Sequence, residues 1–113
     1  MHSFNLSQTL THLNLDVPSF RPVARAYIQD VTEFVAGVTR AAERLDLAGV
    51  AESARALKRV ASVIRADELA RLADQLEASA QTEDTESTAQ VLGQLHHENR
   101  DVTAVLRTVA GYE

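Results

Sequence analysis

The sequence predicts an all-α protein, specifically an antiparallel up-down four-helix bundle preceded by a short N-terminal lid helix. Three observations lead to this fold class. Apolar residues recur at helical spacing in four segments, short connections separate those segments, and the composition favours helices. The 113 residues are 45% hydrophobic but only 4% aromatic, and they include only four glycines and two prolines. A chain of this length can bury a modest core and is expected to form one domain, residues 1–113.

The first long helix is expected from about residue 19 to residue 45. Its inward positions are spaced four, three, four, three and four residues apart, which is the stripe of a helix packed in a bundle. These positions are Tyr27, Val31, Phe34, Val38, Ala41 and Leu45. Ser19 and Pro22 suit the start of this helix, because serine caps free N–H groups and proline lacks only an N–H that has no partner there.

Three further helices follow with the same kind of periodicity. The second long helix, at about 47–64, has its stripe at Leu47, Val50, Ala54, Leu57, Ala61 and Ile64. The third, at about 67–80, directs inward Leu69, Leu72, Ala73, Leu76 and Ala80. The fourth, at about 87–110, directs inward Leu92, Leu95, Asn99, Val102, Leu106 and Val109. Asn99 is the polar member, and it either pairs with another buried polar group or reaches water.

The connections between these helices are short. Asp46 lies near the first break, Arg65 and Ala66 lie near the second, and the polar segment 81–86 forms the third. Short links make consecutive helices antiparallel neighbours. Ahead of the bundle, an amphipathic lid helix that must dock to be stable is expected from Phe4, Leu6, Leu10 and Leu13. The expected organisation is a lid and linker in residues 1–18, with 15–18 as the linker, and a four-helix bundle in 19–110.

Composition and charge exclude several classes of function. The net charge of -5 argues against nucleic-acid binding, which usually requires a basic face. The chain has no cysteine, so it forms no disulfide and no cysteine-based metal site. No His-x-x-x-His or Glu-x-x-His constellation appears at metal-ligand spacing, and we expect neither metal nor cofactor. No signal peptide and no apolar stretch long enough for a membrane span is visible, so a cytoplasmic protein is expected.

Residues 54–69 resemble the signature of histidine-phosphotransfer (HPt) domains, the four-helix-bundle relays of bacterial-type two-component signalling. The family pattern runs Ala-His-x-Leu-Lys-Gly-x-Ala-x-x-x-Gly-Ala-x-x-Leu. Six positions match it in register, namely Ala54, Leu57, Lys58, Ala61, Ala66 and Leu69. The resemblance implies an up-down bundle with an N-terminal lid, and a partner that is a response-regulator receiver domain or a histidine kinase.

Three positions depart from this pattern, and they remove its chemistry. Arg55 stands where the family has its phosphorylatable histidine, and Arg59 and Arg65 stand where it has glycines. A guanidinium is always protonated and offers no lone pair for nucleophilic attack. The resemblance therefore implies a protein that is not an enzyme and does not relay phosphoryl groups through this position.

The same positions define a candidate partner-binding site, made of Arg55, Lys58, Arg59, Ser62 and Arg65. In one interpretation these cations form a positive patch that binds the acidic pocket of a receiver domain, since arginine pairs strongly with carboxylates. The resulting hypothesis is a non-catalytic adaptor or antagonist, with a monomer favoured. In the other interpretation the cations belong to an ordinary solvated helix face, balanced by acids such as Glu52.

Two alternative functions remain open from the sequence. The first is a structural or oligomerising bundle, whose exposed apolar lid exchanges between protomers or holds a partner helix. The second is a phosphorelay through His96 or His97, although neither has the neighbouring lysine of the family site. The two side chains diverge by about 100° on a helix and are poorly placed to share a metal ion. His2 and His12 lie in or beside the lid and belong to no motif.

Overall fold

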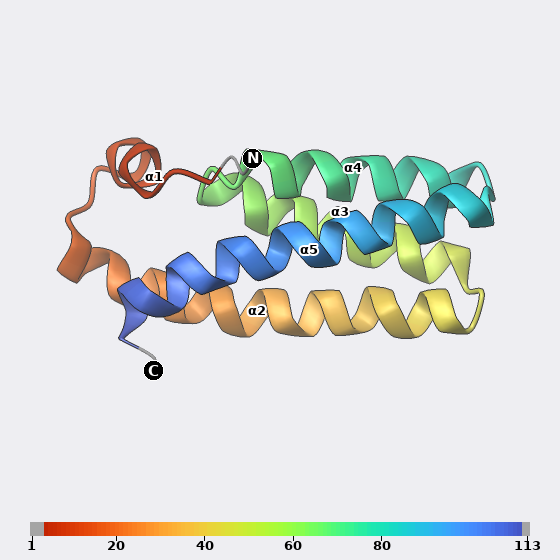
Figure 1. The fold of residues 1–113 in the computed structure, drawn as a ribbon, viewed down its shortest axis with the longest axis horizontal. Coiled ribbons are helices and arrows are strands. Elements are labelled where there is room, and N and C mark those ends of the chain that lie inside the picture. The colour runs from red at the N-terminus through yellow and green to blue at the C-terminus, as the bar shows by residue number, and fades with distance from the viewer. Residues whose placement is uncertain (1–3, 112–113) are drawn as a thin grey trace.

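The computed structural model describes residues 4–111, and this part of the chain is helical with no strand. The five helices are α1 (Leu6–Leu13), α2 (Val17–Glu43), α3 (Leu47–Val63), α4 (Asp67–Gln81) and α5 (Thr85–Ala110) (Figure 1). The all-α class predicted from the sequence is confirmed. No helix within residues 4–111 is both long enough and apolar enough to cross a membrane.

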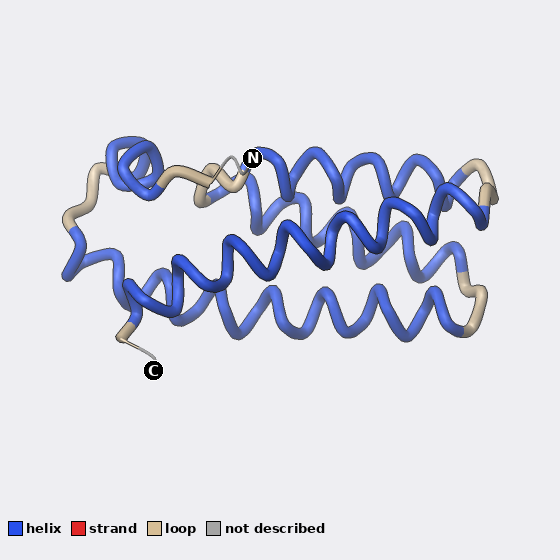
Figure 2. The backbone as a smooth tube through the Cα atoms, in the orientation of Figure 1, coloured by secondary structure: helices blue, strands red, loops and turns tan. Residues whose placement is uncertain are grey.

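The four longer helices pack side by side around an apolar core. α3 packs against α2 and α4, and α5 packs against the same two helices. The turns after α2 and α4 lie at one end of the molecule, whereas the turn after α3 lies on the side where α1 is found (Figures 1 and 2). The largest fully buried side chains come from all four helices and include Phe20, Leu57, Ile64, Leu69, Leu76, Leu95 and Leu106. Each such side chain contributes about 1.5–3 kcal/mol through its removal from water.

The three turns between these helices share one geometry. The middle residue of each turn, Leu45, Arg65 or Glu83, has a positive φ near 60°. Two backbone hydrogen bonds then close each helix end; after α2, for example, Leu45 N–H donates to the Ala42 carbonyl and Asp46 N–H to that of Ala41. This is the Schellman arrangement, which satisfies carbonyls that have no partner inside the helix.

Aspartates cap the first turn of α2, α3 and α5. The carboxylates of Asp16, Asp46 and Asp84 accept hydrogen bonds of 2.9–3.0 Å from backbone N–H groups three residues later. Hydrogen bonds from the side chain and the backbone N–H of Ser19 lower the pKa of Asp16, and those from the backbone N–H and side chain of Ser87 lower the pKa of Asp84, because they favour the charged carboxylate. The cap predicted at Ser19 is therefore wrong: α2 begins at Val17, and Pro18 lies in its first turn rather than in a linker. Proline is tolerated there because the first N–H groups of a helix have no intrahelical partner.

The inward stripe of α2 differs in part from the predicted one. Tyr27, Val31, Val38 and Ala41 are buried as expected, but Leu45 is 73% exposed. The reason is that α2 ends at Glu43, and the left-handed backbone of Leu45 turns its side chain away from the core. Other predicted positions lie at the edge of the core and are only partly buried: Phe34, Leu47, Leu92, Asn99 and Val109.

The predicted lid helix exists and docks on the turn between α3 and α4. Its apolar residues are partly buried and pack against the core; they are Phe4, Leu6, Leu10 and Leu13. Thr9 is completely buried, and its hydroxyl donates a 2.6 Å hydrogen bond to the carbonyl of Ile64. The apolar face of the lid is thus covered by this chain itself, which holds the short α1 in place.

We expect the hydroxyl of Thr9 to hold the lid. Thr9→Val keeps the shape but leaves the Ile64 carbonyl without its buried donor, which costs about 1–3 kcal/mol. Urea unfolding measures this loss, and hydrogen exchange should show faster opening of α1. The matched control is Thr11→Val, because Thr11 is exposed on the same helix. Equal stability of the two variants would contradict this account of the lid.

We also expect glycine to stabilise the turn between α4 and α5. Glu83 has a φ of 58°, a conformation that costs a residue with a side chain about 1–2 kcal/mol. Glu83→Gly removes this cost but increases the conformational entropy of the unfolded chain, which costs about 0.5–1 kcal/mol of stability. A net stabilisation of about 0–1.5 kcal/mol is therefore expected in urea unfolding. Gln90→Gly, at an exposed interior position of α5, should instead destabilise. A loss of stability in Glu83→Gly would refute the role given to this turn.

Candidate partner-binding face of α3

The candidate site lies on α3, and the first turn of this helix is closely packed against its capping residue. Asp46 caps α3 through the N–H of Gly49, and a Cβ added at Gly49 would lie 2.5 Å from an Asp46 carboxylate oxygen. A side chain at position 49 would therefore displace the capping carboxylate of Asp46. From there the helix buries a stripe that is at most 1% exposed, made of Val50, Ala54, Leu57, Ala61 and Ile64. Arg55, Arg59 and Ser62, which lie between these positions, are exposed.

The structure brings four of the five predicted site residues onto the outer side of α3. Arg55, Lys58, Arg59 and Ser62 recur at spacings of three and four, so they share one side of the helix. Arg65 is different, because it occupies the middle of the turn after α3 with a φ of 61°. The site is thus one helix face with a fifth cation at its end.

Three of the four cations are paired with carboxylates of α4. Arg55 Nε donates to Glu77 Oε2 at 2.8 Å, and Lys58 Nζ lies 2.8 Å from Asp74 Oδ1. At the turn, the guanidinium of Arg65 holds both carboxylate oxygens of Asp67, at 3.2 and 3.0 Å. The pairs follow the antiparallel order of the two helices, because cations later in the sequence pair with carboxylates that are nearer the start of α4.

These pairs change the electrostatics of the face. The hydrogen bond to Asp74, together with the charge of that carboxylate, raises the pKa of Lys58. Asp67 raises the pKa of Arg65 in the same way. Because the cations are balanced locally, the face is less positive than its sequence suggests. Arg59 and Ser62 are exposed, and within residues 4–111 neither side chain has an ion pair or hydrogen bond.

The acids that balance the site were not identified from the sequence. Glu52 was the expected neighbour, but it forms no ion pair with a residue of the described chain. The pairing carboxylates are Asp67, Asp74 and Glu77, all on α4. Their spacing of seven and three residues was the available signal, since it places them along one side of a helix. Which side of α3 they meet depends on how the two helices are rotated.

The face offers binding groups rather than reactive ones. A guanidinium cannot accept a phosphoryl group, and the Ser62 hydroxyl has no base within hydrogen-bond distance among the described residues. The described part of the chain also contains no group of three or more histidine or acidic side chains arranged to hold a metal ion. Arginine and lysine side chains in this setting bind carboxylates and other anions.

The histidines lie away from this face. His96 is partly buried on α5, and its Nε2 is 3.2 Å from the Thr39 hydroxyl of α2. His97 is 74% exposed, with Nε2 4.0 Å from Asp101. His12 is exposed on α1, and His2 lies outside the described residues. His96 and His97 thus point to different surroundings, as their adjacency predicted.

A double-mutant cycle tests the pairing of α3 with α4. Arg55→Ala, Glu77→Ala and the double variant should give a coupling energy of about 0.2–1 kcal/mol, because the pair is half exposed on the arginine side. Added salt should reduce this coupling. The control cycle uses Arg59 and Glu52, which form no ion pair and should show no coupling. A larger coupling for the control pair would mean that Glu52, not α4, balances this face.

Comparisons with models of protein families, with curated proteins and with solved structures found no match to the chain. The resemblance to HPt domains therefore rests on the residues from Ala54 to Leu69, which lie in α3, in the turn that follows it and at the start of α4.

Proposed function

We propose that this chain is a non-catalytic HPt-like signalling adaptor, built as an antiparallel up-down four-helix bundle with an N-terminal lid. It binds a receiver domain or a histidine kinase of a two-component system and accepts no phosphoryl group. The observation that carries the proposal is Arg55, which is half exposed in the middle of α3 where the HPt pattern has its histidine. The family position is thus accessible to a partner but occupied by a side chain that cannot react.

The α3 face has the groups that such a partner requires. Arg59 and Ser62 are exposed and unpaired within the described chain, and Val63 beside them is 57% exposed. An interface combining one apolar contact with a guanidinium suits a partner whose binding pocket is acidic. Lys58 can exchange the carboxylate of Asp74 for one of the partner at little cost, because both side chains of this pair are well exposed. Arg55 is held more firmly, because the Glu77 side chain is only 15% exposed.

Binding of this kind acts by occupancy. A chain that covers the docking surface of a receiver or kinase excludes a true phosphotransfer domain from the same surface, and this requires no chemistry of its own. We further propose that the protein is a monomer. We place it in the cytoplasm, where both classes of partner are found.

The test is capture of partners from native lysate by immobilised wild-type protein and by Arg59→Glu, with identification by mass spectrometry. Arg59 is the informative position because it has no ion pair to break, whereas Arg55→Glu would place a carboxylate beside Glu77. We expect wild type to retain a receiver or kinase, and Arg59→Glu to weaken its affinity about tenfold or more, which corresponds to about 1.4 kcal/mol. Affinity should also fall with added salt.

The matched control is Arg44→Glu, since Arg44 is another exposed arginine and lies at the far end of the bundle, after α2. This variant should bind as wild type does. Two results would contradict the proposal: partners that are unaffected by Arg59→Glu, or acid-labile phosphorylation of the chain that disappears when His96 or His97 is replaced. Concentration-dependent assembly without any such partner would favour the oligomerising alternative.

A further inference from the structure

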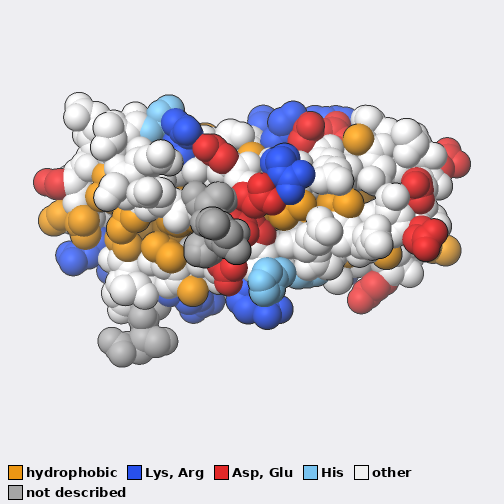
Figure 3. All heavy atoms as spheres, turned by 45° about the horizontal axis from the view of Figure 1, so that its top comes forward, with side chains coloured by type: hydrophobic (Ala, Val, Ile, Leu, Met, Phe, Trp, Pro, Cys, Tyr) orange, Lys and Arg blue, Asp and Glu red, His pale blue; other side chains and the backbone are white. Residues whose placement is uncertain are grey.

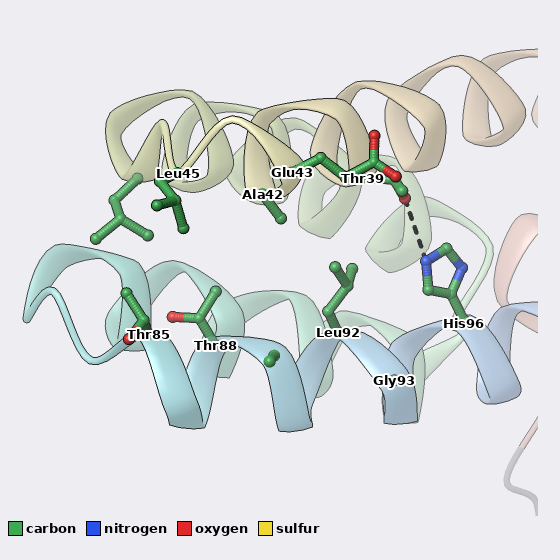
Figure 4. A pocket seen from close by; sticks show the side chains of 11 residues that line it. Thr39, Ala42, Glu43, Leu45, Thr85, Thr88, Leu92, Gly93 and His96 are labelled. Atoms are coloured by element: carbon green, nitrogen blue, oxygen red, sulfur yellow. Dashed lines mark hydrogen bonds between the residues drawn. The ribbon is translucent and has the colours of Figure 1, made fainter.

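An apolar hollow of about 430 Å³ lies between α2 and α5, on a different side of the molecule from the exposed α3 face. Figure 4 shows its walls, with Ala42 and Leu45 above, Leu92 below, and His96 at one end reaching Thr39 across the gap. The volume and the mostly apolar lining are those of a site for a small molecule. Leu45, the most exposed large apolar side chain of the described chain, stands at its rim.

Gly93 on the rim of this hollow is not required by packing. It lies in the interior of α5, where glycine is less favourable than alanine. A Cβ added there would meet no atom within 4 Å, and the backbone is ordinary helix. The effect of the missing side chain is to leave the rim open. A residue that weakens a helix without improving its packing is typical of functional sites.

A second, polar hollow of about 490 Å³ begins on the other side of His96, which lines both. Its walls carry Arg100 and Arg107 from α5, with hydroxyl groups of Thr32 and Thr103, and no acidic side chain lines it. The Asn99 amide also lines it and supplies donors as well as acceptors. Acidic side chains gather at the end of the molecule where the turns after α2 and α4 lie, at the right of Figure 3. Glu43 also lines the apolar hollow, and Figure 4 shows its carboxylate beside Thr39.

We propose that this seam binds a single-chain amphiphile with an anionic head. The apolar tail lies in the hollow beside Leu92 and Gly93, and the head lies at His96 and Arg100. Arg100 sets the direction, because it attracts an anion at the His96 end, and no acidic side chain lines the hollow that contains it. The site is independent of the α3 face, so it stands or falls separately from the adaptor function.

The test uses dodecanoate below its micelle-forming concentration, titrated into ¹⁵N-labelled protein and followed by amide chemical shifts. We expect saturable binding of one molecule. The largest shifts should occur where α2 and α5 line the two hollows, near Thr39 on α2 and near Arg100 on α5. Dodecyl phosphate should bind at the same place, and comparing the two affinities distinguishes a carboxylate head from a phosphate head. Acetate tests the head alone, and dodecyltrimethylammonium tests the tail with the opposite charge; both should bind at least about tenfold more weakly.

Two pairs of variants make the test specific. Ala89→Phe fills the hollow from its α5 wall and should abolish binding, whereas Ala78→Phe, at an exposed position of α4 that lines no hollow described here, should leave it intact. Arg100→Glu should weaken binding about tenfold or more, and Arg59→Glu should not change it. Equal binding of the cationic amphiphile, unchanged binding by Ala89→Phe, or shifts confined to other helices would overturn the proposal.

Discussion

The burial of one stripe of α3 is the constraint on which the rest of the structure depends. Ala54, Leu57 and Ala61 are completely buried where α3 meets α2 and α4, so the rotation of this helix about its axis is settled. The positions between them must then lie outside the core. Arg55 and Arg59 are exposed for this reason, and a face that the core does not use is available to a partner.

The same packing explains why the α3 face is only moderately basic. α3 and α4 are joined by a three-residue turn, so the outer edges of the two helices lie side by side and their charges pair across the gap. Such solvated pairs add little stability but set the local charge. Among the four cations of the predicted site, Arg59 is the one that forms no ion pair within the described chain. Any binding role is therefore concentrated on a residue that the sequence pattern did not distinguish from its neighbours.

Periodicity was sufficient to predict the five helices of the described chain, because each one directs a stripe of apolar residues towards the core. It failed where the outcome depends on the residue at which a helix begins or ends, and on how two helices are rotated relative to each other. Asp16 rather than Ser19 caps α2, since two residues that can both cap lie three positions apart. Leu45 continued the spacing of α2 but lies beyond its end. The pairing of Arg55 with Glu77 and the hollow beside Gly93 both arise from residues on different helices, whose relative rotation no single stripe reveals.

The central claim is that the outer face of α3 binds a signalling partner without chemistry. It is tested most directly by adding a captured and purified receiver or kinase domain, in its phosphorylated form where one exists, to ¹⁵N-labelled chain. The account predicts the largest amide shifts at 55, 58, 59 and 62, with no phosphoryl group transferred to the chain. Shifts that spare α3, or transfer of phosphoryl groups to a histidine of the chain, would contradict it.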